Sequence, residues 1–168
     1  MKFQKLRTYS FFTIMSLMSF YAAAQASFAP PPVVPYGVPI SLESAKKAAG
    51  GAIVEAQKNK WRMAVAIVDT GGHLIYFERM QDTQTGSVDL AIEKAKTAAL
   101  FRRSTKLFQD AVAGGGEGLR LLRLTGAIPI DGGIPIIENG KLVGAVGISG
   151  GSGDQDGQTA MAGAAAVK

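Results

Sequence analysis

The sequence contains no cysteine, and its 168 residues include one histidine and one tryptophan. Without cysteine the chain forms no disulfide, no thiolate nucleophile, no iron–sulfur cluster and no thiolate-ligated haem, and it lacks the residue that is acylated in a lipoprotein. A small exported protein without disulfides depends on a packed core or on association for its stability. His73 is therefore the one imidazole available for acid–base chemistry or for metal ligation.

The N-terminal apolar stretch is too short to cross a membrane. It covers residues 11–24, about 14 residues against the roughly 20 that a spanning helix needs. A basic leader precedes it, and Ala24-Gln25-Ala26 follows with the small-residue spacing that signal peptidase recognises. We expect residues 1–26 to be a signal peptide and the mature protein, which has no membrane span, to be periplasmic or secreted.

Basic charge is also scarce once the leader is removed. The leader takes away three basic and no acidic residues, so the formal net charge falls from +5 to +2. The remaining lysines and arginines form no cluster, which excludes the electrostatic footprint of a nucleic-acid-binding protein. The single histidine has no recognisable Ser–His–Asp setting of a serine hydrolase, and the sequence lacks the P-loop of nucleotide-binding proteins.

Proline and glycine divide the rest of the chain. Residues 27–40 hold five of the seven prolines and predict an extended arm, and all 21 glycines follow residue 26. Apolar periodicity predicts helices at 42–59, 87–103, 105–112 and from 154 onward, a short helix at 119–124, and strands at 63–69, 73–80, 127–130, 134–138 and 142–149. This order predicts an α+β domain, in which helices pack on a mainly antiparallel five-stranded sheet.

Several ordered phrases resemble the GlcG/HbpS-like family, which includes the C-terminal domain of PduO-type proteins. They are VAIVDTGGHLIYFERM (65–80), GSVDLAIEKAKTAALFRRST (86–105), IPIDGGIPI (128–136) and NGKLVGAVGISGGSGDQD (139–156). The resemblance covers most of a domain at 41–168 and implies a profilin-like fold that forms homo-oligomers. It also implies a haem cofactor, because several members of the family bind haem.

His73 is the first candidate site residue, as an axial ligand to haem iron. It follows Gly71-Gly72 at the turn of an expected hairpin, so the alternative is a turn residue that bonds to nearby backbone. If His73 is not the ligand, Tyr76, Met80, Met63 or an oxygen donor would have to serve.

Strand alternation places His73, Ile75, Phe77 and Arg79 on one face of the strand 73–80. Such an apolar wall could seat a porphyrin, with Arg79 pairing with a propionate and Met80 at the end of the strand. The alternative is ordinary core with a solvated charged end. Lys94 and Lys96, on the next helix, are expected at the surface.

The loop 147–157 (GISGGSGDQDG) is the most distinctive stretch, because it joins a strand to a helix. The backbone of Gly150 and Gly151 and the amides of the helix N-terminus could hold an anion such as a carboxylate. Asp154 is the expected N-cap of the helix, and the alternative is a purely structural turn.

Three functions remain open at this point. The first is an exported haem-binding protein for haem or iron handling or sensing, with His73 as the metal ligand and Arg79, Met80, Gly150, Gly151 and Asp154 as further contacts. The second is a small cofactor-free enzyme or binding protein for a carboxylated metabolite. The third is an oligomeric interaction module that docks through residues 27–40.

Overall fold

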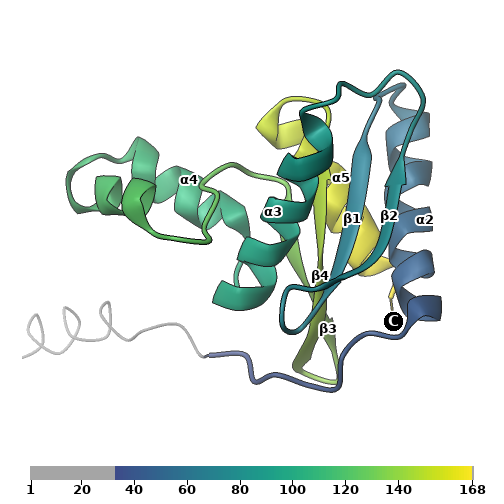
Figure 1. Ribbon diagram of the computed structural model, residues 1–168, viewed down its shortest axis with the longest axis horizontal. Helices are drawn as coiled ribbons and strands as arrows, with labels where there is room; N and C mark the ends of the chain where they lie inside the picture. The colour runs from purple at the N-terminus through teal and green to yellow at the C-terminus, as the bar shows by residue number, and fades with distance from the viewer. Residues whose placement is uncertain (1–32, 168) are drawn as a thin grey trace, which may run out of the picture. The chain divides into compact units, whose positions relative to one another are not determined.

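The computed structural model describes residues 33–167, so the expected signal peptide and residues 27–32 of the arm lie outside it. From Val34 onward the chain folds around a four-stranded antiparallel sheet with the order β2-β1-β4-β3 (Figure 1). The strands are β1 (Ala64–Asp69), β2 (Leu74–Arg79), β3 (Gly133–Glu138) and β4 (Lys141–Ser149). The helices are α2 (Leu42–Lys58), α3 (Ser87–Phe101), α4 (Thr105–Ala113) and α5 (Gly153–Ala165), with a 3₁₀ helix η1 (Gly116–Arg123) after α4.

Helices cover both faces of the sheet, which makes its central strands fully buried. Val65 and Ile67 of β1 face a core shared with α2 and α5, and the alternating Ala66 faces α3. The layers lie close together because small residues line them. A Cβ on Gly147 of β4 would lie 2.0 Å from the carbonyl oxygen of Ala91 in α3, so only glycine permits this approach.

The sheet has four strands where the sequence predicted five. The missing strand is 127–130, which is an irregular connection between η1 and β3. Pro129 has no N–H to give to a ladder, and the backbone N–H of Ile128 donates to Thr97 Oγ1 at 3.0 Å. The N–H of Asp131 likewise donates to Gln109 Oε1 at 2.9 Å. Side chains of the helices thus satisfy backbone donors within and directly after the segment that was predicted as a strand.

The described part of the arm, residues 33–40, contains no helix, and it is bound to the chain's own sheet. Gly37 N–H donates to Leu142 O and Ile40 N–H to Val143 O, both at 2.7 Å. The Tyr36 hydroxyl donates to the carbonyl of Leu100 at 3.0 Å, at the C-terminus of α3. The arm therefore hydrogen-bonds to the first residues of β4, which lie beyond the end of β1.

Serine side chains cap two of the helices. Ser41 caps α2, with its Oγ accepting from Ser44 N–H at 3.1 Å. The N-cap of α5 is Ser152 and not Asp154, because Ser152 and Gln155 form a reciprocal capping box. Within residues 33–167, no helix combines the length and the apolar character that crossing a membrane requires.

Candidate functional site

The turn between β1 and β2 presents His73 to solvent. Its side chain is 81% exposed, and its Nδ1 atom lies 3.3 Å from Asp69 Oδ2. The other oxygen of Asp69 accepts from the backbone N–H of Gly71 and of His73, both at 2.8 Å. One carboxylate therefore organises the turn and also orients the imidazole.

The ionisation of Asp69 determines which nitrogen of the His73 imidazole carries the proton. Burial alone would raise the pKa of Asp69, but the N–H donors of His73 and Gly71 outweigh it and hold the pKa below its ordinary value of 3.8. An ionised carboxylate only accepts hydrogen bonds, so the Nδ1 atom that faces it carries the proton. In the neutral imidazole, Nε2 then has the free electron pair that metal ligation requires.

Apolar and cationic side chains surround the same turn. A Cβ on Gly72 would contact Lys96 Cγ and Leu100 Cγ of α3, which shows how close that helix lies to the turn. Leu100 and Leu74 are 45% and 47% exposed, although both are large apolar residues. Exposed leucines and a lysine of α3 thus lie near the oriented imidazole.

A β-bulge in β2 changes the predicted apolar wall. The pairing of β1 with β2 shifts between Ile67 and Val68, so Tyr76 pairs with Ile67 but Leu74 pairs with Val68. Ile75 consequently packs against the core of α2 and α5, while Phe77 packs on the α3 side. The expectation that Ile75 and Phe77 share a face was wrong, because simple alternation does not hold across a bulge.

Arg79 and Met80 lie at the other end of the hairpin from His73. Arg79 pairs with Ala64, and its guanidinium Nε donates to the carbonyl of Thr83 at 3.1 Å. Met80 is half-buried against the larger core. Of the alternative ligands, Met63 is fully buried and the Tyr76 hydroxyl donates to Glu78 at 3.0 Å.

The glycine loop lies at this second end and already holds a carboxylate of the protein. Asp156 Oδ1 accepts from Gly151 N–H at 2.9 Å, and Asp156 Oδ2 lies 2.7 Å from Lys94 Nζ. Lys94 Nζ also donates to the carbonyl of Ile148 at 3.0 Å. Asp154, two residues earlier in the same first turn of α5, takes no part in this network.

Lys94 is completely buried, so its expected place at the surface was wrong. The periodicity of α3 did place it near the alanines that face the sheet, but its charge favoured a solvent-facing interpretation. Lys94 is stable there because Asp156 and the Ile148 carbonyl satisfy its ammonium group. Sequence reasoning missed this ion pair. The available signal was the position of Lys94 in α3, next to Ala95 and four residues before Ala98, both of which are buried.

Asp131 is the third charged residue in this interior. It is 5% exposed, and its Oδ1 accepts from Gly132 N–H at 2.6 Å. Burial raises the pKa of Asp131 and of Asp156, although Lys94 opposes the shift in both. The cluster of Lys94, Asp131 and Asp156 joins α3, α5 and the start of β3, which indicates a structural role.

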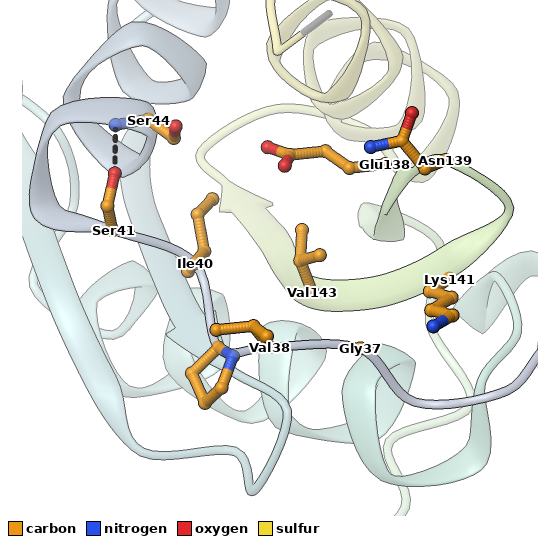
Figure 2. A pocket seen from close by; sticks show the side chains of 10 residues that line it. Gly37, Val38, Ile40, Ser41, Ser44, Glu138, Asn139, Lys141 and Val143 are labelled. Carbon is orange, nitrogen blue, oxygen red and sulfur yellow. Dashed lines mark hydrogen bonds between the residues drawn. The ribbon is translucent and has the colours of Figure 1, made fainter.

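An open groove of about 500 Å³ lies between the arm, the start of α2 and the β3–β4 turn (Figure 2). Glu138, Asn139 and Lys141 supply its polar side chains, and Ile40 and Val143 supply part of its apolar wall. The amide of Ser44 that opens α2 is already taken by Ser41 Oγ, as the dashed line in Figure 2 shows. None of the six predicted site residues lines this groove.

Metal-ligating side chains are sparse in the part of the chain that the structure describes. No group of three or more histidine or acidic residues is arranged there to hold an ion. A metal centre at His73 would therefore bring most of its own ligands, as the iron of a porphyrin does.

Known proteins resemble this chain in sequence over much of the domain. Protein GlcG of Escherichia coli (strain K12) is 40% identical over 95 residues, which are 56% of this chain and 69% of GlcG. The corrinoid adenosyltransferase PduO of Salmonella typhimurium is 32% identical over 132 residues. The match covers 77% of this chain but 39% of PduO, so the chain corresponds to a part of that protein.

Solved structures resemble the fold. The crystal structure of HbpS has a TM-score of 0.72 and 30% identity, and the match covers 83% of this chain and 98% of HbpS. The crystal structure of a PduOC–haem complex has a TM-score of 0.70 and 32% identity, over 78% and 96% of the two chains. Residues 40–165 match the sequence model described as "Haem degrading protein HbpS-like". With this match over most of its length, the chain belongs to the HbpS-like family, as the GlcG/HbpS resemblance predicted.

Proposed function

We propose that the protein is an exported haem-binding protein that handles or senses haem or iron outside the cytoplasm. The observation that carries this proposal is the exposed imidazole of His73, whose Nδ1 faces the Asp69 carboxylate. Membership of the HbpS-like family and the likeness to a PduOC–haem complex support the choice of haem as ligand. Export rests on the sequence of residues 1–26.

The residues around the β1–β2 turn fit an axial ligand and its setting. Bound haem would supply an iron centre that accepts imidazole nitrogen. Asp69 would keep the proton on Nδ1 and hold the ring in place, so that His73 Nε2 keeps its electron pair. Leu74 and Leu100 would cover apolar porphyrin edge, and Lys96 would attract a propionate.

The other predicted contacts belong to the opposite end of the sheet. Arg79, Met80, Gly150, Gly151 and Asp154 gather there, and the six residues of β2 separate them from His73 by about 20 Å. They remain predictions for a ligand at the glycine loop and are not expected to touch a haem held by His73. Arg79→Gln is therefore a useful control in a haem titration.

The proposal is tested by titrating the mature protein with haemin. We expect a saturable Soret shift at micromolar haemin, and a large loss of affinity in His73→Ala with Arg79→Gln close to wild type. Absence of a saturable shift would refute the haem proposal, and an unchanged shift in His73→Ala would refute His73 as the ligand. The preparation also tests export, because protein recovered from the periplasm should begin at Ser27 by mass spectrometry.

The two alternative functions receive less support from the geometry. A carboxylated metabolite at the glycine loop would compete for the Gly151 N–H, which Asp156 already occupies. An interaction module that docks through the arm would have to release Gly37 and Ile40 from their bonds to β4. No observation favours either function over haem binding.

A further inference from the structure

The C-terminus of α3 lies between the His73 turn and the arm. On one side, a Cβ on Gly72 would lie 3.6 Å from Leu100 Cγ, so the Leu100 side chain packs against the backbone of the turn, where Gly72 is buried. On the other side, the carbonyl oxygen of Leu100 accepts from the Tyr36 hydroxyl at 3.0 Å. One residue of α3 therefore contacts both the turn that carries His73 and a side chain of the arm.

Tyr36 supplies a hydrogen-bond donor where the helix itself lacks one. The last four carbonyl groups of an α-helix have no N–H partner within the helix. The Tyr36 hydroxyl lies within hydrogen-bond distance of two carbonyl oxygens at the end of α3, 3.0 Å from that of Leu100 and 3.3 Å from that of Ala99. Tyr36 and Leu100 are 64 positions apart, so the order of this last turn depends on a distant segment of the chain.

Arg102, the C-cap of α3, contacts the arm in return. Its guanidinium carbon lies 5.0 Å from the centre of the Tyr36 ring, within reach of a cation–π interaction. Its Nη1 atom also donates to the carbonyl of Val34 at 3.3 Å. The end of α3 and the arm therefore hold each other, with donors on both sides.

Few contacts hold the arm to the rest of the domain. Among residues 34–40, Ile40 alone is buried, and hydrogen bonds to the backbone of β4 hold Pro35, Gly37 and Ile40. A segment with little buried apolar surface opens at a lower free energy than the core does. The arm can therefore leave the sheet while the domain stays folded, and the end of α3 then loses the donor that Tyr36 supplies.

We propose that Tyr36 is a positioning residue for the His73 turn, and that docking of the arm is coupled to ligand binding at this turn. With the arm docked, Tyr36 fixes the last turn of α3, and Leu100 in turn fixes Gly72 beside His73. A ligand that needs this ordered surface stabilises the docked arm, because coupling between two sites acts equally in both directions. That the ligand is haem rests on the proposed function, whereas the link between Tyr36 and the turn does not.

The first test uses the mature protein without any ligand. Tyr36→Phe removes the hydroxyl but keeps the ring beside Arg102. His73 is the one histidine of the chain, so its ring signals in a proton NMR spectrum are identified without ambiguity. We expect these signals to shift in Tyr36→Phe, and the N–H of Gly72, which donates to Asp69 O at 3.1 Å, to exchange faster with solvent.

Val38→Ser is the matched control, because Val38 belongs to the same arm and is 80% exposed. It should leave the His73 signals and the exchange of Gly72 unchanged, and circular dichroism should show both variants folded. Tyr36→Phe signals identical to those of the wild type would overturn the proposal. Equal changes in both variants would overturn it as well, since any disturbance of the arm would then reach the turn without the Tyr36 hydroxyl.

The second test adds haemin. We expect Tyr36→Phe to weaken haemin binding by about 3–10-fold, the effect of one or two ordinary hydrogen bonds, with Val38→Ser equal to wild type. In the reverse direction, haemin should slow the exchange of the Gly37 and Ile40 amides with solvent. The amide of Asn59, at the far end of α2, serves as the reference that should not change.

The outcomes separate this coupling from the haem proposal itself. If haemin binds with equal affinity to Tyr36→Phe and wild type, or binds without slowing the exchange of Gly37 and Ile40, the coupling is refuted and the haem proposal stands. If haemin does not bind to the wild type, the haem proposal fails. The NMR signals of His73 and the exchange of Gly72 in the ligand-free protein then still decide whether Tyr36 positions the turn.

Discussion

The two ends of the β1–β2 hairpin use a carboxylate in opposite ways. At the turn, Asp69 lies near the surface and orients an imidazole that is 81% exposed. At the other end, Asp156 lies inside the protein, where it binds Lys94 and the Gly151 amide. The first carboxylate orients an exposed side chain, and the second occupies an amide of the glycine loop.

This difference shows why a glycine-rich loop before a helix is weak evidence for a binding site. The amides at such a place attract an anion whether it comes from a ligand or from the protein itself. In this chain Asp156, four residues after Ser152, supplies the anion and Lys94 of α3 balances its charge. The following predictions separate the structural end from the end that we propose binds haem.

The largest effect is expected from Lys94→Met. The substitution keeps a side chain of similar length but leaves Asp156 buried without its partner, which should lower the free energy of unfolding by about 3–5 kcal/mol. Urea denaturation measures this loss. The double variant Lys94→Met/Asp156→Leu should recover much of it, because the buried carboxylate that lost its partner is then removed as well.

Lys96→Met is the matched control on the same helix. Lys96 pairs with Glu93 at 2.9 Å, but both side chains are 39% exposed, so solvent screens the pair. Its removal should cost about 0–1 kcal/mol. Equal losses for Lys94→Met and Lys96→Met would contradict the structural role of the buried pair.

A smaller effect, on affinity, is expected from Asp69→Asn. Asparagine can still accept from the amides of Gly71 and His73, but it no longer holds the proton on Nδ1 of His73 as a carboxylate does. Loss of such a supporting carboxylate typically weakens metal binding by about 10–100-fold. Haemin titration measures the change, with the exposed Asp89→Asn on α3 as control. Equal affinities of Asp69→Asn and wild type would show that Asp69 does not position the ligand.

The smallest effect is a difference between the two ends of the hairpin in how their contribution to stability depends on pH. The pKa of Asp69 is lowered, so its contribution to stability is present above the ordinary value of 3.8 and is lost as the pH falls below it. Burial raises the pKa of Asp131, so the folded state favours the protonated form, and stability is lost as the pH rises above 3.8.

Urea denaturation from about pH 2 to about pH 6 tests these signs. Asp69→Asn should reduce the loss of stability on the acid side. Asp131→Asn, which keeps an acceptor for Gly132 N–H, should reduce the loss as the pH rises. The opposite assignment of the two effects would contradict the pKa directions.

Residue patterns predicted the regular elements well where local chemistry was decisive. Asn139 and Gly140 both have positive φ, 50° and 73°, and their sequence alone predicts the tight β3–β4 turn. The strand predicted at 127–130 failed because the distant side chain of Thr97 accepts from the backbone of Ile128, and Gln109 does the same for Asp131 directly after it. The prediction that Ile75 shares a face with Phe77 failed for a similar reason. The bulge at Ile75 depends on the register of β2 with β1.

The sequence by itself determined the family, the helices and hairpins, and the expectation of export. Those follow from periodicity, turn residues and ordered motifs, which are local along the chain. Only the tertiary structure decided that Lys94 is buried, that Asp156 fills the glycine loop, and that His73 is exposed beside Asp69. The reason is that burial and pairing depend on which distant segment packs against a residue: Lys94 and Asp156 are 62 positions apart, and no local pattern connects them.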